Sequence, residues 1–127
     1  MIQKIKTLAQ DIFKELGAGY SEEVYEKAME VALRLEKIHY ENQRILPIFY
    51  KNFNIGQSTP DLIINDNKGK EKIVIELKAT SAKLGEKEVV QLKKYLEVLN
   101  LKKGILINFP QVCKEGERGV EVREVGV

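Results

Sequence analysis

Thr59-Pro60-Asp61-Leu62-Ile63-Ile64 and Ile73-Val74-Ile75-Glu76-Leu77-Lys78-Ala79 are the two stretches that decide the fold of this chain. Both are rich in the β-branched residues that favour strands, yet each carries a charge within its apolar run. Asn65-Asp66-Asn67-Lys68-Gly69 lies between them and has the composition of a tight turn. We therefore expect two strands, paired across this turn, that bring carboxylates onto one sheet.

The length and composition of the chain limit the possible classes of protein. The 127 residues fit a single domain spanning 1–127, and a chain of this length can form a hydrophobic core without disulfide bonds or structural metals. Cys113 is the single cysteine and His39 the single histidine, which excludes an intrachain disulfide, a CxxC pair and most zinc catalytic sites. No apolar run reaches a membrane span and no signal-peptide pattern opens the chain, so we expect no membrane contact and a cytoplasmic location.

The charge of the chain is compatible with nucleic acid but does not demand it. The net charge is +2 and the pI is near 8.6, below the value of about 9 that points to nucleic acid. Lysines cluster in the half that carries the two charged strands: Lys68, Lys70, Lys72, Lys83, Lys87, Lys93, Lys94, Lys102 and Lys103. On charge alone, a nucleic-acid surface and an ordinary solvated surface both stay open.

Helical periodicity marks two helices at the start of the chain. Ile5, Leu8, Ile12 and Leu16 predict the first helix, which Gly17 ends. Ser21 is the expected N-cap of the second helix. For that helix we predict a buried stripe of Val24, Ala28, Val31, Leu35 and Ile38, and a second face of Glu22, Tyr25, Glu26 and Met29.

The rest of the chain alternates strands with one more helix. We predict a three-stranded meander from residues 42–53, 55–65 and 72–80, in which Pro60 marks an edge or bulge. A helix over 85–100, a buried strand over 103–109 and an edge strand over 119–127 follow. The element order ααβββαββ predicts an α/β fold, a mixed sheet with helices on both faces.

Alternation along the strand places Glu76 and Lys78 on one face and Leu77 on the other. If the two strands pair across the turn, Asp61 falls near Glu76. Carboxylates about 4 Å apart repel by roughly 4 kcal/mol at an effective dielectric of about 20, so a cation must offset them. We expect Asp61, Glu76 and the carbonyl of Leu77 to bind Mg²⁺ or Mn²⁺, while Lys78 orients or deprotonates water and stabilises charge on a phosphate.

Plainer interpretations of these residues also stay open. The 16 Glu and 17 Lys of the chain would produce about two Glu-x-Lys triplets by chance, so the triplet alone carries little weight. An exposed pair on an edge strand would explain Glu76 and Lys78. Asp61 is harder to dismiss because Asp occurs only three times and is depleted in strands, although it could cap a turn after Pro60.

Three motifs together resemble a known family. Pro60-Asp61, a gap of 14 residues and Glu76-Leu77-Lys78 resemble the PD-(D/E)XK nuclease signature. Gly19-Tyr20-Ser21-Glu22-Glu23-Val24-Tyr25 reads as G-x-x-E-x-x-Y, and Gln91-Leu92-Lys93-Lys94-Tyr95 as the Q-x-x-x-Y motif of the recombination-type branch. In this order they are similar to the GxxExxY subgroup, over about residues 5 to 110 and including the Gly104-Ile105-Leu106-Ile107-Asn108-Phe109 strand. The resemblance implies a restriction-endonuclease-like α/β/α core.

The resemblance also implies roles for individual side chains. Asp61 and Glu76 become metal ligands, Lys78 the catalytic lysine, and Glu22 the acidic residue beside the metal. Glu22 could instead only complement the helix dipole. Tyr25, one turn further on, would contact substrate, with a half-buried aromatic as the alternative.

Gln91 and Tyr95 are four residues apart and share one helix face. The resemblance implies that Gln91 contacts the scissile strand or a metal-bound water. Tyr95 would pack on the nucleic acid or on the catalytic lysine. The alternative is a solvated glutamine beside a tyrosine at the edge of the core.

These residues predict a Mg²⁺- or Mn²⁺-dependent nuclease that hydrolyses phosphodiester bonds. DNA rather than RNA is the expected substrate, bound through phosphates without strong base-sequence readout. The lack of a cysteine cluster excludes the iron–sulfur variants, and a homodimer is compatible with the sequence. Two other classes stay open: a catalytically silent nuclease-fold module that binds nucleic acid or a protein partner, and a regulatory or small-molecule protein that uses the acidic pocket.

Overall fold

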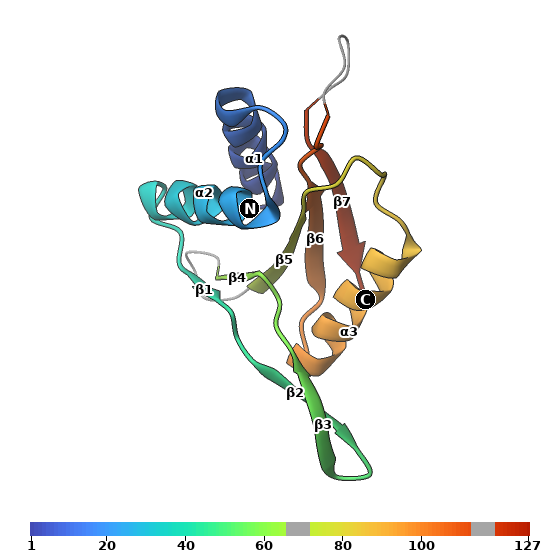
Figure 1. Cartoon of the computed structure of the whole chain (residues 1–127). Coiled ribbons are helices and arrows are strands. Elements are labelled where there is room, and N and C mark those ends of the chain that lie inside the picture. The colour runs from blue at the N-terminus through green and yellow to red at the C-terminus, as the bar shows by residue number, and fades with distance from the viewer. Residues whose placement is uncertain (66–71, 113–118) are drawn as a thin grey trace.

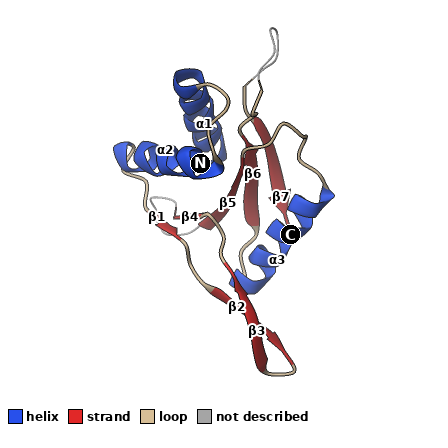
Figure 2. Cartoon of the chain, viewed as in Figure 1, coloured by secondary structure: helices blue, strands red, loops and turns tan. Residues whose placement is uncertain are grey.

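A five-stranded mixed sheet forms the centre of the molecule, with two helices on one face and one helix on the other (Figures 1 and 2). The computed structural model describes residues 1–65, 72–112 and 119–127. Its elements are α1 (Ile2–Leu16), α2 (Glu22–Leu35), β1 (Tyr40–Asn42), β2 (Leu46–Tyr50), β3 (Phe53–Ser58), β4 (Leu62–Asn65), β5 (Lys72–Lys78), α3 (Glu86–Leu99), β6 (Lys103–Asn108) and β7 (Glu121–Gly126). The predicted mixed sheet covered by helices on both faces is confirmed.

The strand order of the main sheet is β1-β4-β5-β6-β7. β4 and β5 pair antiparallel, with Leu62 opposite Ile75, as the turn signal predicted. The turn residues 66–69 themselves lie outside the described residues. β5 and β6 are parallel and are connected through α3, so both strands are covered on both faces and read as continuous apolar runs.

The predicted meander is wrong in one respect: within the described residues, five strands rather than three precede α3. β2 and β3 pair only with each other, as a separate two-stranded ribbon. The run over 55–65 breaks at Pro60, which has no N–H for a ladder. The next N–H, that of Asp61, donates to the Glu76 carboxylate instead of a strand. The chain therefore leaves the ribbon and restarts as β4 in the main sheet.

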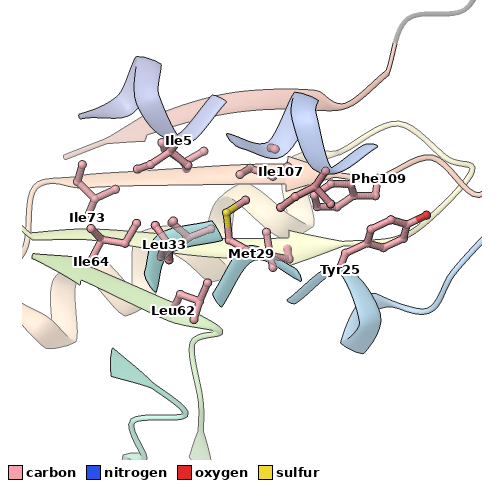
Figure 3. Close-up of a cluster of buried hydrophobic side chains, with 14 of the residues drawn as sticks. Ile5, Tyr25, Met29, Leu33, Leu62, Ile64, Ile73, Ile107 and Phe109 are labelled. Atoms are coloured by element: carbon pink, nitrogen blue, oxygen red, sulfur yellow. The ribbon is translucent and has the colours of Figure 1, made fainter. Parts of the chain in front are cut away.

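Two apolar clusters hold the helices against the sheet. Figure 3 shows the larger one, which joins α1 and α2 to β4, β5 and β6 through residues including Ile5, Tyr25, Met29, Leu33, Leu62, Ile107 and Phe109. The smaller cluster lies under α3 and includes Val74, Leu92, Leu96 and Leu106. None of the helices within the described residues has the length and apolarity of a membrane span.

The predicted buried face of α2 needs correction. Tyr25, Met29 and Leu33 are completely buried, whereas Val31 and Leu35 are exposed. Ile38, which follows the helix, is buried as predicted. Both stripes of α2 have helical spacing, so periodicity could not choose between them. The larger side chains of Tyr25 and Met29 fill the space above the sheet, which turns the acidic residues of the same face toward the end of β5.

Candidate active site

Asp61 and Glu76 hold each other through the backbone. The Asp61 N–H donates to Glu76 Oε1 at 2.8 Å, and the Leu77 N–H donates to Asp61 Oδ2 at 2.7 Å. These reciprocal bonds follow from the antiparallel register of β4 and β5, which places Asp61 opposite Glu76. The predicted proximity of the two carboxylates is therefore confirmed. One oxygen of each carboxylate is left for another partner.

Burial makes this pair electrostatically unfavourable when both groups are charged. Burial, and then the charge of the neighbouring Asp61, raise the pKa of Glu76 from 4.5 to about 8. Burial also raises the pKa of Asp61 from 3.8 to about 6, opposed by the Leu77 N–H. Such shifts are common where carboxylates do chemistry, because a buried charge must be offset by a nearby cation.

Lys78 is the cation that the sequence supplies beside the pair. It lies two residues after Glu76 on β5 and is half-buried, and its charge lowers the pKa of both carboxylates. Within the described residues it forms no ion pair at 4.0 Å or less. Its ammonium donors are therefore available to another group near the carboxylates.

Two acidic residues of α2 add negative charge to the same place. The charge of Glu22 raises the pKa of both Asp61 and Glu76. Glu26, one turn later, has its pKa raised from 4.5 to about 7 by burial and then by Asp61. Sequence reasoning did not select Glu26 as a site residue, although its i, i+4 spacing from Glu22 was a usable signal.

A cleft of about 440 Å³ opens beside these carboxylates. It is lined by Glu26, Gln43, Ile45, Gln57, Thr59, Pro60 and Asp61. Its wall combines α2, the residues that follow β1 and the end of β3. Segments distant in sequence therefore converge on Asp61, which makes this cleft the candidate entrance to the site.

The donor set fits a hard divalent cation. Mg²⁺ binds through one or two carboxylates and completes its shell with water and substrate phosphate, and Asp61 and Glu76 supply two such carboxylates. In the described part of the chain, no three His, Cys, Asp or Glu side chains form a closed ligand group. Glu22 is thus close enough to act electrostatically but is not arranged as a third ligand. Oxygen ligands without His or Cys favour Mg²⁺ or Mn²⁺ over zinc.

Tyr25, for which a substrate contact is predicted, lies in the core. Its ring is completely buried and stacks on Phe109 at 4.3 Å between centroids. Its hydroxyl donates to the Gly17 carbonyl at 2.6 Å and accepts the Tyr20 N–H at 3.3 Å. Gly19 has a φ of 104°, a conformation that suits glycine alone. Gly19 and Tyr25 therefore shape the loop that precedes Glu22.

Gln91 and Tyr95 share one face of α3, as predicted. Gln91 Nε2 donates to the Tyr95 hydroxyl at 3.2 Å, and the Ser58 hydroxyl donates to the same oxygen at 2.8 Å. The Tyr95 ring is buried under α3 while Gln91 is exposed. Ser58, which sequence reasoning missed, thus fixes the end of β3 to α3. Among the described residues, Tyr95 makes its hydrogen bonds with Ser58 and Gln91 and none with Lys78.

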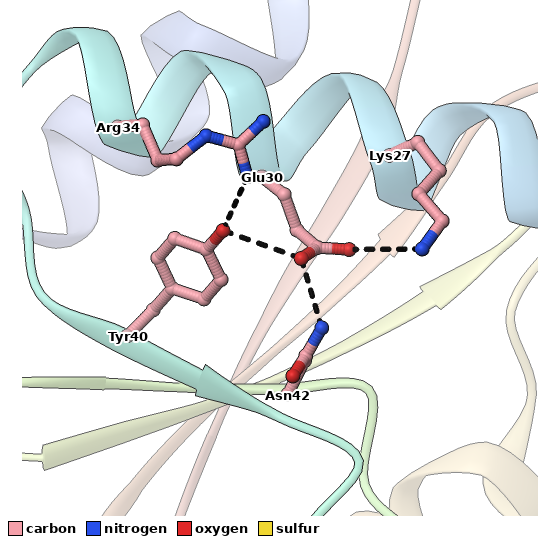
Figure 4. A network of polar contacts seen from close by, with 5 residues as sticks. All are labelled: Lys27, Glu30, Arg34, Tyr40 and Asn42. Atoms are coloured by element: carbon pink, nitrogen blue, oxygen red, sulfur yellow. Dashed lines mark hydrogen bonds and ion pairs between the residues drawn. The ribbon is translucent and has the colours of Figure 1, made fainter.

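Figure 4 shows a polar network that fixes α2 over the edge of the sheet. Glu30 is buried, and its Oε1 accepts hydrogen bonds from Tyr40 at 3.2 Å and Asn42 at 2.9 Å. Arg34 donates to the Tyr40 hydroxyl at 2.7 Å, and the Lys27 ammonium lies 3.9 Å from Glu30 Oε2. Because Glu30 follows Glu26 by one turn, the network also sets where the acidic face of α2 stands.

The fold and the site together define a nuclease-like domain: a mixed sheet between helices, with two carboxylates and a lysine at the adjoining ends of two strands. The chain belongs to the PD-(D/E)XK nuclease superfamily, whose family model matches residues 1–120. The expected restriction-endonuclease-like core is thereby confirmed. No curated protein is a significant match.

Several solved structures resemble the chain, and two of them show the extent of the likeness. The crystal structure of SSO0001 is similar with a TM-score of 0.60 and 20% sequence identity, over 83% of this chain and 50% of that chain. The chain thus spans half the length of that protein. A structure of Archaeoglobus fulgidus Hjc, a Holliday junction resolvase, is similar with a TM-score of 0.48 and 15% identity, over 83% of this chain and 71% of that chain. At these identities the likeness concerns the fold.

Proposed function

We propose that this chain is a Mg²⁺- or Mn²⁺-dependent nuclease that hydrolyses phosphodiester bonds of DNA. The observation that carries the proposal is the reciprocal pair of Asp61 and Glu76, with the charge of Lys78 acting on both carboxylates and Asp61 lining an open cleft. Membership of a nuclease superfamily supports the same reaction.

Each residue of the pair has a role that its position permits. Asp61 and Glu76 would hold the divalent cation, with the Leu77 carbonyl as a further oxygen ligand. When bound, the cation lowers the pKa of water and neutralises charge on the phosphate. Lys78 orients the attacking water and donates hydrogen bonds to the phosphate oxygens as their charge grows. Glu22 and Glu26 strengthen the attraction of the site for a cation.

We further place the chain in the GxxExxY subgroup on Gly19, Glu22 and Tyr25. In this proposal the motif positions Glu22. Gly19 and Tyr25 fix the preceding loop, and Glu22 lies in the first turn of α2. Contact with DNA is made mainly through phosphates, which carry no base sequence. We therefore expect cleavage to depend on the shape of the DNA and little on its sequence.

Cleavage of fluorescently labelled DNA tests the proposal directly. Single-stranded, duplex and branched oligonucleotides are incubated with the protein in EDTA, Mg²⁺ or Mn²⁺. We expect cleavage with metal only, and a loss of at least about 100-fold in Asp61→Asn and Lys78→Ala. Glu15→Gln, on exposed α1 surface, is the matched control and retains full activity. Cleavage that survives Asp61→Asn would refute the site.

Metal binding can be measured without any activity. Mn²⁺ alone should raise the melting temperature of the wild type, because a ligand that binds only the folded state stabilises it. Asp61→Asn should abolish that shift and melt higher than the wild type in EDTA. If DNA binds but no metal supports cleavage or shifts melting, the chain is a silent nuclease-fold binding module.

A further inference from the structure

The β2–β3 ribbon projects away from the main sheet (Figures 1 and 2). Several of its large apolar side chains are exposed to solvent. Phe53 is 73% exposed and Tyr50 is 60% exposed, and Ile48, Phe49 and Ile55 are also exposed. Each strand of the ribbon has a free edge, since β2 and β3 pair only with one another in the described structure. An exposed apolar patch of this extent marks a site of interaction.

The tip of the ribbon is a hairpin turn of defined geometry. Lys51 and Asn52 have φ values of 47° and 69°, the positive angles of a two-residue hairpin turn that matches the strand twist. Tyr50 and Phe53 are cross-strand partners directly before and after this turn. Lys51 Nζ also lies 5.4 Å from the centre of the Tyr50 ring. Two aromatic rings and one cation therefore stand at the end of a short, regular turn.

Both ends of the ribbon are attached at the candidate active site. β3 leads through Thr59 and Pro60 directly to Asp61, and Gln57 lines the cleft beside it. Ser58 is tied to Tyr95, and Leu46 at the start of β2 is buried in the cluster under α3. With about 3.3 Å per strand residue, the tip stands roughly 15–20 Å from the cleft, the length of about five nucleotides of stacked duplex.

The charges of the ribbon favour nucleic acid as the occupant. Residues 46–58 of the ribbon contain Lys51 as their single charged residue and no acidic residue, whereas Arg44, which precedes the ribbon, is paired with Glu41 at 2.7 Å. Asn52, Asn54 and Gln57 add amide donors on exposed positions. A second copy of the chain would offer the same positive charge, whereas a phosphate backbone is complementary to it.

We propose that the ribbon tip is a stacking wedge for unpaired bases, which gives the site a preference for branched or partly single-stranded DNA. This inference rests on the proposed nuclease function and names its substrate class. Tyr50 and Phe53 offer ring faces on which exposed bases stack irrespective of sequence. In continuous duplex, insertion of the wedge requires the free energy of unstacking a base step. At a branch or single-strand junction the bases are already unstacked, so this free energy is not required.

The test measures binding in EDTA, where the proposed metal-dependent cleavage is excluded. Each oligonucleotide carries 2-aminopurine at the branch or at the matched position of continuous duplex. We expect Phe53→Ala and Tyr50→Ala to weaken binding of branched DNA about 5- to 50-fold, to remove the fluorescence change, and to leave duplex binding nearly unchanged. Leu35→Ala, which shortens an equally exposed apolar residue on α2, is the control and behaves as wild type.

The outcomes separate this inference from the proposed function. Unchanged branch preference in both tip variants overturns the wedge, even if metal-dependent cleavage is observed. Ribbon-dependent branch binding without cleavage by any metal supports the wedge and refutes the nuclease. If light scattering shows that the tip variants turn a dimer into a monomer with the same DNA preference, the ribbon is a contact between copies and the wedge is refuted. Circular dichroism confirms that the exposed substitutions leave the fold intact.

Discussion

Glu76→Gln should stabilise the metal-free protein at pH values above about 4.5, where Glu76 ionises in the unfolded chain. Glu76 is 4% exposed, and burial together with Asp61 raises its pKa from 4.5 to about 8. The folded state therefore holds this proton more tightly than the unfolded chain does. Below about pH 4.5 both states are protonated, and the group leaves stability unaffected. Between about pH 4.5 and pH 8 the unfolded chain loses this proton while the folded state keeps it, so stability falls across this range, and above pH 8 the loss is complete.

The size of the effect follows from that displacement of the pKa. A change from 4.5 to about 8 corresponds to about 5 kcal/mol of stability lost by pH 9. The charge of Asp61 is one cause of the raised pKa of Glu76, so the losses at these two groups are not independent and are not added. About 5 kcal/mol is a large share of the 5–15 kcal/mol that holds a typical domain folded.

Urea unfolding in EDTA, followed by circular dichroism from pH 4.5 to pH 9, measures the effect. Glutamine keeps a carbonyl oxygen for the Asp61 N–H, so the variant retains this bond. We expect Glu76→Gln to match the wild type within about 1 kcal/mol at pH 4.5 and to exceed it by about 3–5 kcal/mol at pH 9. Glu15→Gln should show no such divergence. Parallel curves for Glu76→Gln and the wild type would refute the electrostatic account of the pair.

Three further substitutions test how the site is supported. Tyr25→Phe should cost about 1–2 kcal/mol by removing the hydroxyl bond to Gly17, with DNA affinity unchanged; weaker DNA binding at equal folding would restore Tyr25 as a substrate contact. Gly104→Ala should cost about 1–3 kcal/mol in urea unfolding, because its Cβ would lie 2.9 Å from Leu92, and an unchanged midpoint would contradict that packing. Glu30→Ala should lower the free energy of unfolding by about 2 kcal/mol, and Glu30→Gln, which keeps an acceptor, should lower it less. Equal losses in the two variants would exclude the hydrogen bonds of Figure 4 as the cause.

The pairing of Asp61 with Glu76 could be predicted because it depends on local rules. A strong turn joins two apolar runs, and strand alternation then decides which residues meet. The boundaries of β3 and β4 could not be predicted in the same way. They depend on the Asp61 N–H bonding to a carboxylate 15 residues further along the chain. A hydrogen bond between residues this far apart leaves no periodic trace in either segment.

The buried face of α2 and the role of Glu26 were missed for a related reason. Helical spacing identified two apolar stripes, and only packing against the sheet shows that the stripe of Tyr25 and Met29 is buried. Once that stripe faces inward, Glu26 is carried to the cleft beside Asp61, where burial raises its pKa. Likewise, the bond from Ser58 to Tyr95 spans 37 residues and becomes visible only in three dimensions.

One property of the site connects its stability to its proposed chemistry. The backbone bonds that hold Asp61 and Glu76 are present without a metal, so the ligands are in place before a cation arrives. A proton on Glu76 neutralises the negative charge that would bind the proposed cation. Metal and proton would therefore compete for the same carboxylate. The pH rise that destabilises the metal-free fold thus frees the carboxylates to bind metal. If the proposed cation binds here, a site that loses stability by becoming charged would regain it on binding, and the metal-bound form would be favoured at neutral and higher pH.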